Sequence, residues 1–138
     1  MVKRPKHTLV LHPEQYTIHR LAPSAAVPTS LLDSPFCSVT RTPSELSVVT
    51  QQTAASLDHP QSPGWRALSV MGPLDFALVG VLAGLAGILA DAQVSVFTVS
   101  TYDTDWLFVQ SDALARARQA LEAEGHVVRE DSTPPGTS

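Results

Sequence analysis

Residues 94–110, VSVFTVSTYDTDWLFVQ, decide the fold because they predict two β-strands joined by a short turn. VSVFTVST (94–101) is rich in the β-branched residues Val and Thr, which is typical of a strand. The run DWLFVQ (105–110) predicts a second strand after the turn. Between the strands lie Tyr102, Asp103 and Asp105, side chains suited to water or to a charged ligand.

The sequence on each side of this hairpin predicts one strand and one helix. GWRALSVMG (64–72) alternates like a strand, and PLDFALVGVLAGLAGILADA (73–92) predicts a helix that begins at Pro73, since proline suits the first helical position. SDALARARQALEAEG (111–125) predicts a second helix with Ser111 as N-cap and Gly125 as its stop, followed by the strand HVVRE (126–130). The resulting β-α-β-β-α-β order predicts a ferredoxin-like α+β fold, an antiparallel sheet with helices on one face.

The first half of the chain contains a weaker copy of this pattern. SVTRTPSELSVV (38–49) aligns without a gap to TVSTYDTDWLFV (98–109), and a strand in 15–23 and a short helix in 28–34 would precede it. We therefore expect a degenerate first module over residues 7–60 and a complete second module over 61–131. The proline-containing tail, 132–138, is expected to be disordered.

Composition excludes several classes of protein. The 138 residues carry a net charge of −4, which argues against non-specific nucleic-acid binding, and the single cysteine cannot form an internal disulfide. The five histidines have no zinc-like spacing with that cysteine. The uncharged run 76–90 contains Gly80-x-x-x-Gly84, but it is shorter than the about 20 residues of a membrane span. We expect a fully buried helix in a soluble, cytoplasmic protein.

Residues 64–128 resemble the ACT domain family, with GPLDF (72–76) and STYDTD (100–105) as the most specific segments. They are similar to the C-terminal module of small prokaryotic proteins with two ACT domains, and to the ACT modules of CASTOR-type cytosolic arginine sensors. FCSVTRTPSELSVV (36–49) resembles the family more loosely. The resemblance implies tandem ACT-like modules that hold a free amino acid at an interface between modules. Such modules are sensors or regulators, with no chemistry of their own and no cofactor.

A free amino acid presents a carboxylate beside an ammonium group, so its site needs donors next to acceptors. A helix that begins at Pro73 offers unpaired N–H groups at the positive end of its dipole, and a glycine before it allows close approach. Across from them, two neighbouring aspartates repel unless a positive group lies between them, which leans toward a basic ligand. The expected ligand-binding residues are Gly72, Leu74, Asp75, Phe76, Leu78, Ser100, Thr101, Tyr102, Asp103 and Asp105, closed by Ser38 and Val39 of another module.

The same features predict how such a protein would associate. An uncharged helix and the unpaired sheet edges of a small module favour a homodimer. Ligand binding would shift the relative placement of modules, and a regulated protein partner could read that shift.

Other interpretations of the same residues stay open. Asp-Thr-Asp in a tight connection is also ordinary turn chemistry, and an interaction module with a vestigial site would have the same fold. A D-x-D motif after a strand also occurs in aspartate-nucleophile phosphatases and in metal sites. No lysine or further acidic cluster follows here to complete such a site, so a small enzyme is the less favoured interpretation.

Overall fold

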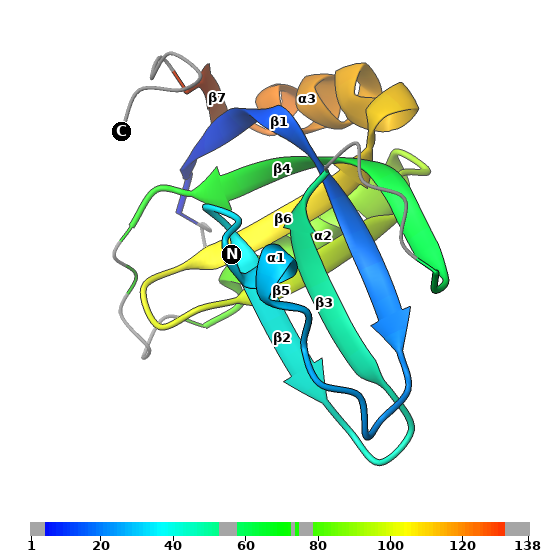
Figure 1. Ribbon diagram of the computed structural model, residues 1–138. Helices are drawn as coiled ribbons and strands as arrows, with labels where there is room; N and C mark the ends of the chain where they lie inside the picture. The colour runs from blue at the N-terminus through cyan, green and yellow to red at the C-terminus, as the bar shows by residue number, and fades with distance from the viewer. Residues whose placement is uncertain (1–4, 53–57, 73, 75–78, 132–138) are drawn as a thin grey trace. The chain divides into compact units, whose positions relative to one another are not determined.

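The computed structural model describes residues 5–52, 58–72, 74 and 79–131. The chain forms two compact units, the first from residues 1–13 and 66–138 and the second from residues 14–65. The predicted tail over 132–138 lies outside the described residues. The elements, labelled in Figure 1, are β1 (Thr8–Leu21), α1 (Thr29–Leu32), β2 (Cys37–Arg41), β3 (Leu46–Gln51), β4 (Gln61–Val70), α2 (Val81–Asp91), β5 (Val96–Ser100), β6 (Asp105–Gln110), the 3₁₀ turn η1 (Ser111–Ala113), α3 (Leu114–Ala123) and β7 (Val127–Glu130).

The first unit contains the predicted β-α-β-β-α-β order, formed by β4, α2, β5, β6, α3 and β7. In its sheet, β6 lies between β4 and β5, and the beginning of β1 lies between β4 and β7. The β5–β6 pair is antiparallel, whereas β1 and β7 run parallel. The α+β, ferredoxin-like fold predicted for this part of the chain is therefore confirmed.

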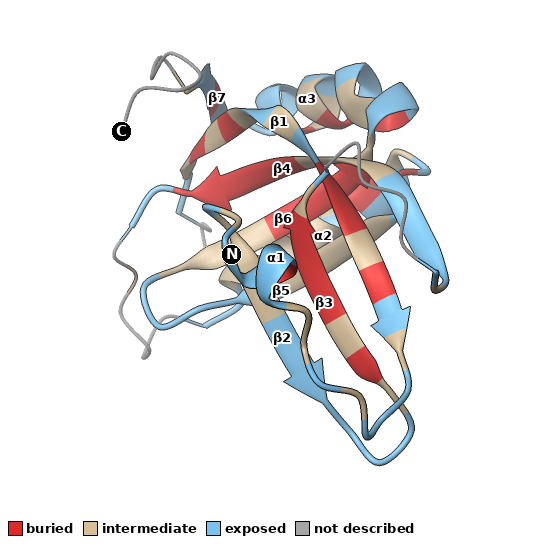
Figure 2. Ribbon diagram, viewed as in Figure 1, coloured by how far each residue is buried: buried red, intermediate tan, exposed pale blue. Residues whose placement is uncertain are grey.

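The core of the first unit lies between one face of its sheet and the two helices. Alternate strand residues such as Leu68, Val70, Leu107 and Val109 form one cluster with Leu85 and Leu89 of α2 and Leu121 of α3. Figure 2 shows these buried positions along β4 and β6. Because a strand turns successive side chains to opposite faces, the alternation in the sequence places this apolar set against the helices.

The second unit has a β-α-β-β order with a smaller core. β3 pairs antiparallel with β2 on one side and with the second half of β1 on the other. Leu31, Leu46 and Val48 are buried together, with the half-buried Cys37 against them. Burial raises the pKa of the Cys37 thiol, so the thiol stays protonated at neutral pH. The predicted short helix and hairpin are present, and the ACT-like character of this unit stays a prediction.

The start of the long helix was predicted wrongly. Helix α2 begins at Val81, after Gly80, which has a left-handed φ of 80°. Leu74, expected in the first helical turn, instead donates its backbone N–H to the Asp103 carbonyl oxygen at 2.7 Å. An amide engaged with a neighbouring hairpin does not belong to a helix start, and an L-side chain rarely adopts the conformation of Gly80.

The expectation that this helix is fully buried was also wrong. Leu85 and Leu89 are buried, but Ala83, Gly87 and Ala90 are exposed. A Cβ atom added at Gly87 would meet no atom within 4 Å. In the described residues, no helix has the length and apolar character needed to cross a bilayer.

Helix α3 ends as predicted but begins differently. Gly125 has a φ of 92°, and the N–H groups of Gly125 and His126 donate to the carbonyls of Glu122 and Leu121, which is a Schellman motif. Ser111 was expected to cap the helix N-terminus. It instead opens the 3₁₀ turn, and α3 begins after Ala113 with no side-chain cap. The interposed turn moves the helix start by three residues.

Candidate functional site

The β5–β6 hairpin is closed by the hydroxyl groups of Ser100 and Thr101 and by one of its two acids, Asp105. Ser100 and Asp105 are cross-strand partners, and the Ser100 hydroxyl donates to Oδ1 of Asp105 at 2.6 Å. The backbone N–H and hydroxyl of Thr101 both donate to the Thr104 carbonyl oxygen, at 2.8 and 3.0 Å. In the described part of the chain the Asp103 carboxylate has no hydrogen-bond partner. The turn is therefore stable without this carboxylate.

Two contacts fix the hairpin turn to the end of β4. The Thr104 hydroxyl donates to the Val70 carbonyl oxygen at 2.5 Å, and the Leu74 N–H donates to the Asp103 carbonyl oxygen. Gly72 lies in the same contact, because an added Cβ atom would be 3.0 Å from that oxygen. The close approach expected of Gly72 is thus made to the protein's own backbone, and Gly72 is not part of the cavity wall described next.

A cavity of about 310 Å³ separates the hairpin turn from the start of α2. Its size is at the lower end of the range for small-molecule sites. Its lining residues all come from the first unit, and they are Leu74, Gly80, Val81, Leu82, Ala83, Ser100, Thr101, Tyr102, Asp103, Thr104 and Asp105. The residues predicted from the sequence on the hairpin side, together with Leu74, are brought together at this cavity.

Helix α2 presents its positive end to the cavity. The N–H groups of Val81, Leu82 and Ala83 have no acceptor within the helix, because the first intrahelical bond runs from Gly84 N–H to the Gly80 carbonyl at 2.9 Å. Those groups and the helix dipole favour an anion at this end. The helix start therefore offers the donors that the sequence interpretation assigned to residues after Pro73.

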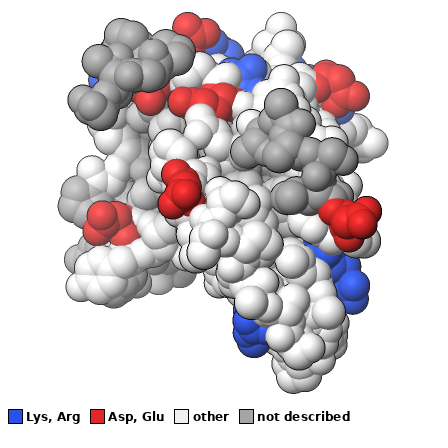
Figure 3. All heavy atoms as spheres, viewed as in Figure 1, with Lys and Arg blue, Asp and Glu red and all other residues white. Residues whose placement is uncertain are grey.

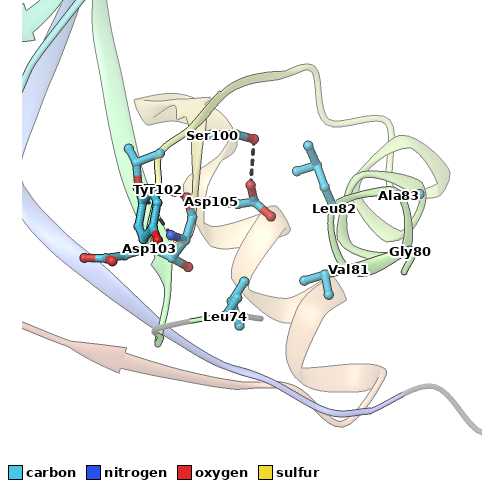
Figure 4. Close-up of a pocket in the computed structure, with 11 residues that line it drawn as sticks. Leu74, Gly80, Val81, Leu82, Ala83, Ser100, Tyr102, Asp103 and Asp105 are labelled. Atoms are coloured by element: carbon cyan, nitrogen blue, oxygen red, sulfur yellow. Dashed lines mark hydrogen bonds between the residues drawn. The ribbon is translucent and has the colours of Figure 1, made fainter. Parts of the chain in front are cut away.

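The two aspartates lie differently toward the cavity. Figure 4 shows the Asp105 carboxylate directed toward Leu82 and the start of α2, whereas the Asp103 carboxylate points to the other side of the turn. Tyr102 lies on the rim, with 81% of its surface exposed. In the described lining Asp103 and Asp105 are the charged residues, so the wall that faces the helix carries a single negative charge.

The remaining predicted site residues are not among the described residues that line this cavity. Asp75, Phe76 and Leu78 lie outside the described residues. Ser38 and Val39 belong to β2 of the second unit, where they pair with Val49 and Val48. The sequence interpretation missed Gly80, Val81, Leu82, Ala83 and Thr104. A glycine inside an apolar run was the available signal for Gly80, and it was interpreted as helix packing.

A second polar cluster in the first unit has the residue types of a nucleophile and a base. The His12 ring contacts the Ser69 hydroxyl at 2.8 Å through Nε2 and the Asp131 carboxylate at 3.5 Å through Nδ1. Its ring is stacked on Trp106, with the ring centres 4.5 Å apart. Ser69 is buried, and His12, Ser69 and Asp131 are not among the residues that line the cavity described above.

Two further kinds of site, a metal site and a nucleic-acid interface, can be compared with the described residues. The described ranges contain no cluster of three or more His, Cys, Asp or Glu side chains that could hold a metal ion. On the face drawn in Figure 3, the Lys and Arg atoms form small separate groups. Nucleic-acid binding uses a continuous basic surface, which that face does not offer.

Family models match both parts of the chain. An ACT domain model matches residues 62–123, and a model described as an N-terminal domain matches residues 14–57. No curated protein matches the sequence.

Solved structures match over nearly the whole chain. A protein from Agrobacterium tumefaciens is 30% identical, with a TM-score of 0.88 over 97% of this chain and 100% of that one. A Vibrio cholerae protein of unknown function, described as a possible transport protein, is 21% identical (TM-score 0.67, 86% and 90% covered). The ligand-free regulatory subunit of aspartate kinase from Thermus thermophilus is 10% identical and shares the fold (TM-score 0.58, 85% and 96% covered). The ACT domain model over residues 62–123, together with the hairpin and the helix that it covers, shows that this chain contains a domain of the ACT family.

Proposed function

We propose that this protein is a regulatory module that binds a free amino acid without transforming it. One observation carries the proposal. The amides of Val81, Leu82 and Ala83, which have no acceptor within α2, and the Asp105 carboxylate lie on opposite sides of one cavity. A carboxylate beside an ammonium group is the ligand chemistry that complements such a pair.

Each group in the cavity then has a defined role. The ligand carboxylate accepts hydrogen bonds from the amides at the start of α2, where the helix dipole adds to the attraction. The ligand ammonium donates to Asp105, whose Oδ1 already accepts the Ser100 hydroxyl at 2.6 Å. The Ser100 bond holds the carboxylate in place, and Oδ2 is available for the ligand. Each such charge-assisted hydrogen bond contributes about 1.5–3 kcal/mol.

The proposal includes an assembly and a readout. The exposed apolar side of α2, with Ala83, Gly87 and Ala90, supports a homodimer, which size-exclusion chromatography with light scattering tests. Ligand binding would favour one arrangement of modules over another, and a partner protein in the cytoplasm would respond to that change.

Thermal-shift and calorimetric titrations with the free amino acids test the function. A ligand present at 100 times its Kd stabilises the fold by about 2.7 kcal/mol. Asp105→Asn keeps an acceptor for Ser100 but removes the charge, so we expect about 10- to 150-fold weaker binding. The matched control is Asp103→Asn, which removes the carboxylate that points away from the helix and should change the affinity less than threefold.

The titration also separates the proposal from its main alternative. An interaction module with a vestigial site has the same fold and would show no stabilisation by any amino acid. A flat response of the wild-type chain across the whole panel contradicts the proposed function. Equal losses in Asp103→Asn and Asp105→Asn would contradict the assignment of the ammonium site.

A further inference from the structure

Beside the hydroxyl-bearing residues Thr101, Tyr102 and Thr104, the cavity wall that remains after the carboxylate and ammonium are placed has an apolar part. Leu74, Val81 and Leu82 line it, and all three pack against the hydrophobic core of the first unit. Figure 4 shows Leu74 and Val81 on the same side of the space between the Asp105 and Leu82 side chains. A wall continuous with the core presents a fixed apolar surface, and burying apolar ligand groups on it is favourable.

The charges of the described lining complement an α-amino acid without a charged side chain. Asp105 is the acid that faces the start of α2, and the α-ammonium group of the ligand neutralises it. A lysine or arginine side chain brings a second cation that needs a second acid, and the Asp103 carboxylate points away from the gap. An acidic side chain would meet Asp105 with no Lys, Arg or His in the described lining to compensate it.

We infer that the cavity selects a free amino acid with an uncharged, apolar side chain, and that Leu74, Val81 and Leu82 form its side-chain subsite. This inference rests on the proposed function and replaces the basic ligand expected from the pair of aspartates. The volume of about 310 Å³ suits one amino acid rather than a peptide.

Calorimetric titration of the full chain with matched ligands tests this class. Norleucine and lysine have the same straight four-carbon side chain and differ by the terminal ammonium group, so we expect norleucine to bind at least tenfold more tightly. Along the series alanine, 2-aminobutyrate, norvaline and norleucine, affinity should rise about fourfold per methylene until the subsite is filled.

Leu82→Ala tests the subsite itself. The variant removes apolar wall without touching Asp105, so norleucine should bind about tenfold more weakly while alanine, which does not reach the wall, keeps its affinity. Circular dichroism and a wild-type-like alanine affinity show that the variant is folded.

The outcomes distinguish the inference from the function on which it rests. Lysine or arginine binding as tightly as norleucine overturns the apolar subsite and leaves amino-acid binding intact. Equal affinities of alanine and norleucine overturn the subsite as well. A chain that binds none of these amino acids overturns both proposals.

Discussion

Gly72 offers the sharpest test of how the site is held together, and we predict that Gly72→Ala lowers the free energy of unfolding by about 1–3 kcal/mol. The added Cβ atom would lie 3.0 Å from the Asp103 carbonyl oxygen, 3.1 Å from the Leu74 nitrogen and 3.3 Å from Thr104 Cβ. The first two atoms are backbone, and a 2.7 Å hydrogen bond joins them. Relief of the clash therefore stretches that bond, whose net contribution is about 1 kcal/mol, or leaves overpacking of similar cost.

Gly87→Ala is the matched control, because it makes the same chemical change with the opposite expected sign. A Cβ atom at Gly87 meets no atom within 4 Å, and the residue lies inside α2. Alanine in a helix interior is more favourable than glycine by about 0.5–1 kcal/mol. Urea unfolding followed by tryptophan fluorescence measures both changes. A Gly72→Ala protein as stable as wild type would show that the hairpin does not press on the end of β4.

Three further predictions concern stability. Gln93 has a left-handed φ of 63° at the end of α2, so Gln93→Gly should raise the free energy of unfolding by up to about 1 kcal/mol in urea titration, and a loss would contradict the strain. Arg116→Ala removes donors to the carbonyls of Ala92 and Gln93, at 3.0 and 3.1 Å, and should lower the unfolding free energy by about 0.5–1.5 kcal/mol. Burial, together with His59, lowers the pKa of His19 from its ordinary value of 6.5, so the unfolded chain takes up the proton more readily. The urea midpoint should therefore fall as the pH drops below about 6.5. A urea midpoint that stays constant from pH 7.5 to 5.5 would contradict the lowered pKa of His19.

Features set by neighbours in the chain could be predicted from the sequence. The apolar run in residues 106–109 predicts a buried strand, and Leu107, Phe108 and Val109 are fully buried. The stop at Gly125 follows from one residue, because a φ of 92° suits glycine. Ser100 and Asp105 were each predicted at the joint between the two strands, and the structure shows that they are cross-strand partners.

Features set by contacts between distant segments of the chain could not be predicted from the sequence. The first strand was expected in residues 15–23, but β1 begins at Thr8, where residues 8–11 pair in parallel with residues 127–130 of β7. Nothing in the local sequence reports a partner more than a hundred residues away. The run from residue 74 to 90 is apolar at nearly every position, so it carries no period that marks where the helix begins.

The hairpin turn and the start of the long helix nevertheless line the same cavity, as expected, although the helix begins at Val81 and not at Pro73. Thr104, directly before β6, contacts Val70, the last residue of β4, so the β5–β6 turn lies at the end of the sheet where β4 ends. Leu74, four residues after the end of β4, and Gly80, directly before α2, both line the cavity beside that turn. Because the helix begins at Val81 and not at Pro73, the backbone amides that face the hairpin are different from those expected. A helix start still lies opposite Asp105. The arrangement of strands and helices therefore leads to a cavity at this end of the sheet. The residues that line the cavity depend on where the helix begins, and it begins directly after Gly80.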